Sequence, residues 1–508
     1  MKYQVILSRS FSQYEQKHFG YGLIIGSFVI VWSICTVFFH YSDPLTVLNL
    51  QQLNGTIEEA AHGTALVSVP KFVDIPTYPI ESKNNVKAET KGVKKNNLNN
   101  NYAVDNVKED IKQMADQINT RLSCNTSEPR LSYCKIEGRN IMIQGNSSTI
   151  FIPAGSCSKL EKQYLWSITP YVRKDSIALT QRVKKWHVNS TSGFPACSQN
   201  SNIPAILFSI GGYSGNTFHD FSDIIVPLYL TSKKFNGEVK FLLSDYKPWW
   251  VSKFSVILKH LSNYQVININ IDQEVRCYEQ LIIGLEFHKE LSIDSQRTTD
   301  NGGDLMSMKD FKAFLRGAFS LNRTSAIKVH KHNHSHGLRP RLVIISRKWS
   351  RSFTNQDEIV KMATTVGYNV ILAEARLSTN LSEFAGLLNS GDVLMGVHGA
   401  GLTNMVFLPE DAVVIQIIPF GNIDGLARKC FKNPAKDMNI RYLEYKIRVE
   451  ESSLIHQYPR NHSILRDPSS IHRHGWDAVK STYLDKQNVR LDVKRFRVVL
   501  LTALKLLH

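Results

Sequence analysis

Several common sequence signatures are absent from this chain of 508 residues. It contains no zinc-finger spacing, no RNP-like motif and no stripe of basic and aromatic residues, which argues against a nucleic-acid partner. It also contains no internal repeat and no Asp-x-Asp pair, so a divalent cation held by such a pair is disfavoured. Positive charge is abundant, with a formal net charge of +17, and it indicates anionic partners such as phosphates, acidic polysaccharides or a membrane surface.

Charge of either sign is missing from one long run near the N-terminus. The run Tyr21–Phe39 has no charged residue over nineteen positions, about the minimum length for a membrane-spanning helix. Three basic residues precede it and no Lys or Arg follows before Lys71, so the positive-inside rule places the N-terminus in the cytosol. We therefore expect a cytosolic tail at 1–20, a transmembrane anchor at 21–39 and a lumenal body; a cleaved signal peptide is the alternative.

Residues 40–117 are expected to form a lumenal stem, largely disordered. The part Ser82–Asn106 is rich in Asn and Lys and almost free of large apolar residues, so it cannot bury enough surface to fold. Such a segment acts as a spacer that holds a folded body away from the bilayer.

Glycosylation sequons and cysteines agree with a lumenal body. Acceptor asparagines for N-glycosylation occur at Asn54, Asn125, Asn146, Asn189, Asn322, Asn333, Asn380 and Asn461. Of seven cysteines, one lies in the expected anchor, and the remaining even number permits disulfides in an oxidising compartment. Cys124 and Cys134 are close enough in sequence to close a short loop, and the other pairings stay open.

Strands alternate with helical patterns over the body, which predicts an α/β fold with parallel sheets. Apolar runs at 205–210, 240–244 and 265–269 predict strands of an N-terminal Rossmann-like domain, residues 118–330. Runs at 341–347, 368–374, 392–397 and 412–419 predict a second Rossmann-like domain, residues 331–465. Residues 466–508 end in an amphipathic helix, expected to pack back across both domains.

Two loop features bear on ligands. The stretch from Gly391 to Pro409 predicts a buried strand that passes through His398-Gly-Ala-Gly401 into a helical turn. Backbone N–H groups in such a turn can approach an anion, although the spacing is neither GxGxxG nor a P-loop. Histidines alternate at His330, His332, His334 and His336, and we interpret them as a surface loop with no metal site.

These motifs together resemble glycosyltransferase family 61. The resemblance rests on His398-Gly-Ala-Gly-Leu-Thr-Asn404, Phe407-Leu-Pro and Val413-Val-Ile-Gln416, and its plant branch is matched further by Ser346-Arg347, Thr354-Asn355, Gly211-Gly-Tyr, Asn216, His219-Asp220, Asp245-Tyr-Lys-Pro-Trp-Trp250, Phe287-His-Lys-Glu-Leu-Ser-Ile, Phe311 to Arg316 and His474-Gly-Trp-Asp. It covers roughly residues 120 to 507 and leaves out the tail, anchor and stem.

The resemblance implies a GT-B fold, in which two Rossmann-like domains face a cleft. It implies a Golgi type II membrane enzyme that transfers arabinofuranose or xylose from a UDP-sugar, with inversion, to cell-wall xylan. The N-glycan core β-1,2-xylosyltransferase, a non-catalytic scaffold of a synthase complex and a nucleotide-sugar hydrolase or carbohydrate-binding module are the alternatives. A homo- or hetero-oligomer stays open, and we expect no cofactor beyond the UDP-sugar substrate.

An inverting transfer needs a stabiliser of the leaving diphosphate and a base for the acceptor hydroxyl. Without Asp-x-Asp, fixed cations and backbone N–H groups are expected to hold the donor. The donor-binding candidates are Arg347, Arg351, Asn355, Glu374, His398, Gly399, Ala400, Gly401 and Asn404. The alternatives are surface ion pairs for the arginines and helix caps for the asparagines.

The candidates for the base lie in the N-terminal domain. Asp220 would act as the base or orient His219, Asp223 is the reserve, and capping of the following helix is the alternative role for Asp220. For the acceptor sugar we select Asn216, Trp249 and Trp250, with buried core aromatics as the alternative for the tryptophans.

Overall fold

The computed structural model describes the folded body and not the N-terminal segments. The described residues are 120–125, 130, 132–153, 165–173, 179, 181–191, 193, 195–297, 305–328, 339–374 and 379–508. The expected tail, anchor and stem, Asn54, Asn333, two cysteines (Cys35 and Cys157) and the histidine run 330–336 lie outside these ranges. Within them, no helix is long and apolar enough to cross a membrane.

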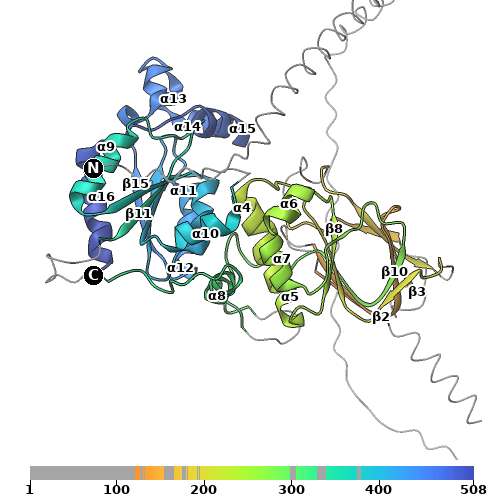
Figure 1. Cartoon of the computed structure of the whole chain (residues 1–508). Coiled ribbons are helices and arrows are strands. Elements are labelled where there is room, and N and C mark those ends of the chain that lie inside the picture. The colour runs from red at the N-terminus through yellow and green to blue at the C-terminus, as the bar shows by residue number, and fades with distance from the viewer. Residues whose placement is uncertain are drawn as a thin grey trace, which may run out of the picture. The chain divides into compact units, whose positions relative to one another are not determined.

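The chain folds as a mixed α/β structure with two sheets (Figure 1). The strands are β1 (Arg121–Asn125), β2 (Tyr133–Gln144), β3 (Thr149–Pro153), β4 (Leu165–Ile168), β5 (Trp186–Thr191), β6 (Gln199–Ser201), β7 (Ala205–Ser209), β8 (Lys240–Ser244), β9 (Ile267–Asn268), β10 (Val275–Ile283), β11 (Arg341–Ile345), β12 (Asn369–Ala373), β13 (Val393–Val397), β14 (Val413–Ile418) and β15 (Arg441–Lys446).

The helices include α-, 3₁₀- and π-helical segments. They are α4 (Thr217–His219), η2 (Asp220–Ile225), α5 (Val226–Ser232), η3 (Lys233–Phe235), α6 (Pro248–Lys253), α7 (Ser255–Leu261), α8 (Met308–Ala318), α9 (Gln356–Val366), α10 (Leu381–Asn389), η4 (Ala400–Phe407), α11 (Asp424–Ala427), η5 (Arg428–Lys432), α12 (Asn433–Asp437), η6 (Val449–Glu451), η7 (Ser453–His456), α13 (Ser463–Arg466), α14 (Pro468–Arg473), α15 (Trp476–Val479), η8 (Lys480–Asp485) and α16 (Val493–Leu506).

The first sheet is larger and more mixed than a Rossmann-like domain. Its main order is β4-β5-β3-β2-β10-β7-β8-β9, with β1 paired to β2 and β6 to β10. Strands β10, β7, β8 and β9 run parallel, whereas β2 pairs antiparallel with β10. The expected strands at 205–210, 240–244 and 265–269 are therefore the parallel part of a ten-stranded sheet.

The second sheet is fully parallel, with the order β12-β11-β13-β14-β15. In a doubly wound sheet of this order, the connections leave β11 towards one side and β13 towards the other. The carboxyl ends of β11 and β13 therefore flank the point where such sheets bind ligands. The strand β15 adds a fifth member to the four strands expected from the sequence.

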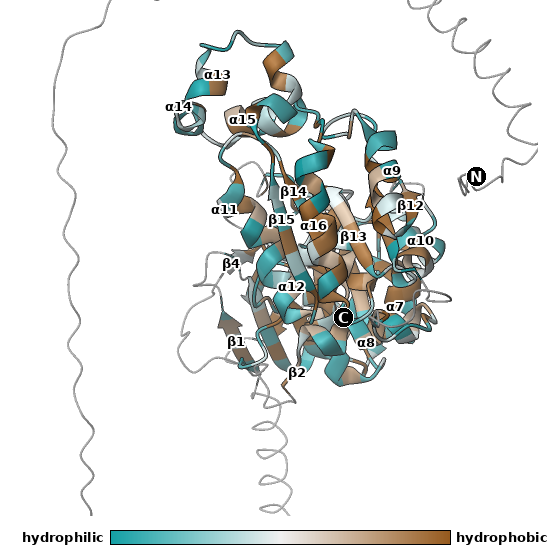
Figure 2. Cartoon of the chain, turned by 90° about the vertical axis from the view of Figure 1, so that its left-hand side faces the viewer, coloured by the Kyte–Doolittle hydropathy of each residue, from teal (hydrophilic) through white to brown (hydrophobic). Residues whose placement is uncertain are grey.

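Both faces of the second sheet are covered, which explains the near-continuous apolar strands. All residues of β13 and β14 are buried. Figure 1 shows α9 and α16 on one side of this sheet and α10, α11 and α12 on the other, and Figure 2 shows the hydrophobic colour of β13 and β14 between these layers. Burying each aliphatic side chain contributes about 1.5–3 kcal/mol, so these strands are a main source of stability.

The two sheets share one hydrophobic core. Phe221 packs edge-on against Phe407 of η4 with ring centroids 5.8 Å apart, and buried residues around both sheets belong to a single cluster. The helix α4 lies where the two halves meet, in contact with η4 (Figure 1). The helix α16 packs on α9, β14 and β15, so its main partners belong to the second sheet and not, as expected, to both halves.

Candidate active site

The loop after β11 brings two arginines to the turn after β13. A Cβ added to Gly399 would lie 2.9 Å from Nη1 of Arg351 and 3.0 Å from Nη1 of Arg347. Gly399 has a φ of +149°, which an L side chain rarely adopts. The glycine therefore lets the backbone of the turn approach both guanidinium groups.

Neither guanidinium forms an ion pair with a carboxylate of the described residues. Arg351 donates from Nη1 to the carbonyl of His398 at 3.0 Å, and its buried Nε has no partner. Burial, followed by the charge of Arg347, lowers the pKa of Arg351 to about 10, and burial also lowers the pKa of Arg347. Two half-buried cations side by side favour an anion between them.

The loop that carries Arg351 is fixed by the C-terminal segment 487–491. The Arg351 N–H donates to the carbonyl of Gln487 at 2.6 Å, and the Thr354 N–H donates to that of Val489 at 2.9 Å. The side chain of Asn355 bonds both the N–H and the carbonyl of Leu491, at 3.0 and 2.9 Å. Asn355 is thus buried and used as a structural tie, which favours a structural role over the expected contact with the donor.

His398 lies buried at the end of β13. Gln416 Nε2 lies 2.7 Å from His398 Nδ1, and the ring of Phe431 packs edge-on against the imidazole with centroids 5.7 Å apart. Burial, together with the charges of Arg351 and Arg347, lowers the pKa of His398 to about 3. The imidazole is therefore neutral, because a proton would add a third positive charge beside two arginines.

The remaining donor candidates lie around this turn. Ala400 and Gly401 begin the 3₁₀-helix η4, and Asn404 donates within it to the Gly401 carbonyl at 2.9 Å. Glu374 follows β12 and pairs with Lys348 at 3.3 Å. The loop 348–352 also exposes Trp349, at 92 % of its surface.

The acid–base candidates lie where β7 passes through a turn into α4 and η2. Asn216 caps α4, its Oδ1 accepting from the Phe218 N–H at 3.1 Å. The π-helical turn η2 then holds Asp220 and Asp223, and such wide turns are frequent at functional sites. The first sheet thus presents its acidic residues at the carboxyl end of a parallel strand.

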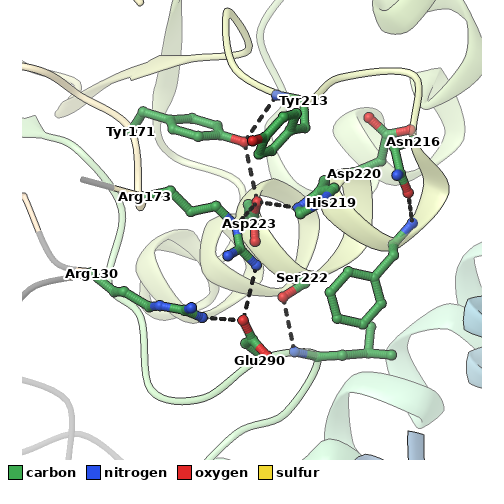
Figure 3. A network of polar contacts seen from close by, with 12 residues as sticks. Arg130, Tyr171, Arg173, Tyr213, Asn216, His219, Asp220, Ser222, Asp223 and Glu290 are labelled. Atoms are coloured by element: carbon green, nitrogen blue, oxygen red, sulfur yellow. Dashed lines mark hydrogen bonds and ion pairs between the residues drawn. The ribbon is translucent and has the colours of Figure 1, made fainter. Parts of the chain in front are cut away.

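Asp223, and not Asp220, is the partner of His219. Asp223 Oδ2 accepts three hydrogen bonds: from His219 Nδ1 at 2.8 Å, from Arg173 Nε at 2.6 Å and from the Tyr171 hydroxyl at 3.2 Å (Figure 3). Burial raises the pKa of Asp223, but His219 and Arg173 outweigh it and bring the pKa below its ordinary value. Asp223 is thus an ionised, buried orienting group.

The carboxylate of Glu290 also belongs to this network. Glu290 pairs with Arg173 at 3.1 Å and also with Arg130. Arg173, Tyr171 and Glu290 were not selected as site residues from the sequence, because they lie far from Asp223 in the chain. Glu290 belongs to the motif that begins at Phe287, but the motif alone does not place it in this network.

Asp220 is fully buried and points away from His219. Its Oδ1 accepts from the Gly215 N–H at 3.0 Å and from Trp250 Nε1 at 2.9 Å, and its Oδ2 has no partner. Burial raises the pKa of Asp220 to about 6. Asp220 therefore does not orient His219, and its burial leaves His219 as the accessible member of the three.

The neighbouring tryptophans differ in exposure. Trp250 is fully buried, so the expected stacking of Trp250 on a sugar is wrong. Trp249 is 43 % exposed and stays a candidate for the acceptor.

Aromatic rings connect the acid–base candidates around His219 with the turn at His398. Phe218, adjacent to His219, packs edge-on against Phe431 with centroids 5.8 Å apart, and Phe431 in turn contacts His398. His219 itself lies against Tyr213, with centroids 4.4 Å apart. The packing therefore sets the acid–base candidates of one half close to the arginine-lined turn of the other.

Two disulfides lie in the region of the first sheet, one between β1 and β2 and one between the segment before β6 and β10. One links Cys124 to Cys134, the pair selected from the sequence, and the other links Cys197 to Cys277. Of the acceptor asparagines that the structure describes, Asn146, Asn322, Asn380 and Asn461 are exposed, and Asn125 and Asn189 are half-buried. Among the described residues, no cluster of His, Cys, Asp and Glu has the arrangement of a metal site.

Comparisons with known proteins agree on one family. The family model described as Glycosyltransferase 61 matches residues 221–415. The rice (Oryza sativa subsp. japonica) alpha-1,3-arabinosyltransferase XAT3 is 42% identical over 411 residues, covering 80% of this chain and 69% of the relative. The rice beta-1,2-xylosyltransferase XYXT1 is 40% identical over 402 residues, covering 76% of this chain and 84% of the relative.

Among solved structures, the bacterial iron-containing dodecameric glycosyltransferase TibC from enterotoxigenic E. coli matches at 11% identity. The match covers 59% of this chain and 81% of that chain with a TM-score of 0.22, too low to support an argument.

Proposed function

Because this chain belongs to glycosyltransferase family 61, we propose that it transfers a pentose, arabinofuranose or xylose, from a UDP-sugar to xylan. The names of the rice relatives, an arabinosyltransferase and a xylosyltransferase, support a pentose. We place it in the Golgi membrane as a type II protein, anchored by residues 21–39 with its folded body in the lumen.

The observation that carries this function is the approach of Arg347 and Arg351 to Gly399 without a carboxylate partner among the described residues. The UDP-sugar diphosphate provides the missing negative charge, and guanidinium forks match its oxygens. The N–H groups of the 399–401 turn add donors to the same anion. These fixed positive groups make a divalent cation unnecessary in the proposed mechanism.

The acceptor side uses His219 as general base. Asp223 accepts from His219 Nδ1–H, so the lone pair of Nε2 is free to take the proton of the acceptor hydroxyl. That oxygen attacks the anomeric carbon opposite the UDP leaving group, which inverts the configuration. The two halves act as a GT-B pair, with the acceptor on the first sheet and the donor on the second.

An activity matrix tests the proposal. Membranes that contain the full chain are incubated with UDP-arabinofuranose or UDP-xylose and with xylan oligosaccharides or N-glycan peptides. Transfer of the pentose to xylan supports the proposal. Transfer to N-glycans alone overturns it, and so does a protein that binds UDP but transfers no sugar. Activity that a chelator abolishes and Mn²⁺ restores would refute the metal-free mechanism.

Variants of the arginines test the site itself. Arg347→Ala and Arg351→Ala are each expected to weaken UDP binding by about 10–100-fold, from about 1.5–3 kcal/mol per charge-assisted contact. Arg497→Ala, on the exposed side of α16, is the matched control and should bind UDP normally. Unchanged UDP binding in both arginine variants would show that the diphosphate lies elsewhere.

A further inference from the structure

Gln416 is the one polar side chain of β14 and is fully buried. A buried amide needs hydrogen-bond partners, because leaving it unpaired costs about 1–3 kcal/mol. The side chain has two: Nε2 lies 2.7 Å from His398 Nδ1, and Oε1 accepts from the Tyr442 hydroxyl at 2.7 Å. The amide therefore connects β15 to the end of β13, across the strand between them.

The chain of contacts continues to the exposed side of β15. The Tyr442 hydroxyl lies 3.3 Å from Glu444 Oε2, and Arg428 pairs with Glu444 through Nε at 3.0 and 3.1 Å and through Nη2 at 2.5 Å. Arg428 belongs to η5, the segment that also supplies Phe431 against the imidazole. His398 is thus held by a polar contact with Gln416 and by aromatic packing against Phe431.

We propose that Gln416 is a positioning residue that fixes His398 in the tautomer with its proton on Nε2. The proposal deepens the proposed function, on which it rests for the identity of the ligand. Because the amide nitrogen is a donor, His398 Nδ1 must accept, and a neutral imidazole then has its N–H at Nε2. His398 in this state donates a hydrogen bond to the UDP diphosphate beside Arg347 and Arg351.

The opposite orientation of the amide would give the opposite tautomer. With Oε1 towards His398, the proton would lie on Nδ1, and Nε2 would offer a lone pair that repels phosphate oxygens. With Oε1 towards Tyr442, the hydroxyl donates to Gln416 over 2.7 Å; in the opposite orientation it would accept from Nε2 and donate to Glu444, which lies further away at 3.3 Å. The shorter contact favours the first arrangement. Burial and the charges of Arg351 and Arg347 also lower the pKa of His398, which keeps the ring neutral in either orientation of the amide.

The test is a direct measurement of the tautomer. The full chain is labelled with ¹⁵N-histidine in detergent micelles, and long-range ¹H–¹⁵N spectra identify the protonated ring nitrogen, with His398→Asn assigning the signal. We expect Nε2–H in the wild type. In Gln416→Glu the carboxylate can only accept, so the proton is expected on Nδ1, with at least tenfold weaker UDP binding.

Two further variants separate positioning from packing. Tyr442→Phe removes the group that orients the amide and is expected to give a mixture of both tautomers. Val414→Ala creates a cavity in the same buried strand, and in this variant His398 should keep its proton on Nε2. A wild-type protein with Nδ1–H, or the same tautomer in Gln416→Glu as in the wild type, would overturn the inference.

The measurement does not depend on turnover. If Nε2–H is found but UDP does not bind, the tautomer inference stands and the proposed function fails. If UDP binds to a protein that has Nδ1–H, the function stands and the role of Gln416 is wrong.

Discussion

His219 Nδ1 and Asp223 Oδ2 are joined by a hydrogen bond of 2.8 Å within a single turn of helix. The carboxylate is fully buried, whereas the imidazole keeps 18% of its side-chain surface exposed. An ionised carboxylate in this position keeps the histidine proton on Nδ1 and leaves the lone pair of Nε2 free. The pair therefore has the geometry of a histidine with an orienting acid.

Replacement of His219 by Ala should lower kcat by about 10²–10⁴-fold, the usual contribution of a general base. The thermal stability should fall only modestly, because the buried carboxylate of Asp223 keeps Arg173 and Tyr171 as partners. Steady-state kinetics and a melting curve provide the two readouts. His260→Ala, an exposed histidine on α7, is the control and should keep full activity.

Replacement of Asp223 by Ala should reduce stability as well as activity. The change leaves Arg173 buried without its closest carboxylate, and removing one partner of a buried pair costs about 3–5 kcal/mol. Arg173 keeps Glu290, so the lower end of that range is expected. Urea unfolding measures the change in the free energy of unfolding. An unaltered midpoint would mean that the contact between Arg173 and Asp223 does not stabilise the folded protein.

The approach of Gly399 to the arginines predicts a selective defect. In Gly399→Ala the new methyl group meets both guanidinium groups and occupies a φ of +149°, so the arginines must move and UDP binding should weaken by at least tenfold. Gly386→Ala is the matched control, because its Cβ meets nothing within 4 Å on α10. Calorimetric titration with UDP compares the two, and equal affinities would contradict the expected crowding.

The sequence was most informative where apolar runs are continuous. The runs at 341–347, 368–374, 392–397 and 412–419 correspond to β11, β12, β13 and β14, because strands buried on both faces need apolar residues throughout. β15, with the sequence Arg-Tyr-Leu-Glu-Tyr-Lys, was missed because polar residues alternate along a half-exposed edge.

The site was predicted less completely than the strands. Residues near one another in sequence, such as Arg347 and Arg351, were selected together, but the pairing of His219 depended on helix geometry. His219 and Asp223 are four residues apart, the spacing that places two side chains on one face of a helix, whereas Asp220 follows His219 directly and faces elsewhere. The sequence also could not place Trp250 inside the core or bring Arg173 to Asp223, since both follow from long-range packing.

Asp220 predicts a pH-dependent stability. Burial raises its pKa to about 6 from an ordinary value of 3.8, so between about pH 4 and 6 the folded protein holds a proton that the unfolded chain has lost. Its contribution to stability therefore falls as pH rises through this window and is constant above it. In Asp220→Asn this loss is absent.

The unfolding free energy of Asp220→Asn minus that of the wild type should accordingly increase between pH 4 and pH 7. The increase is at most about 3 kcal/mol, since one pKa unit corresponds to 1.36 kcal/mol. Guanidinium unfolding at several pH values gives the difference. A flat difference would mean that the carboxyl group is hydrated in solution.

The two disulfides should differ in their effect on stability. Cys197 and Cys277 are 80 residues apart, whereas Cys124 and Cys134 are 10 apart, and a longer closed loop restricts the unfolded chain more. Replacing both cysteines of a disulfide by serine is expected to lower the free energy of unfolding by about 4 kcal/mol for Cys197–Cys277 and by about 3 kcal/mol or less for Cys124–Cys134. Melting curves rank the two variants, after mass spectrometry under non-reducing conditions establishes the wild-type pairings; the reverse order would contradict the loop-length argument.

The ties between residues 351–355 and 487–491 have a consequence for synthesis on the ribosome. The chain that supplies Gln487, Val489 and Leu491 emerges after both sheets have been translated, so a nascent chain can form its strands before its arginine loop has partners. The anion site is then the last part of the second half to take shape. A substitution in this late segment should leave both sheets folded and still produce a protein that cannot retain UDP.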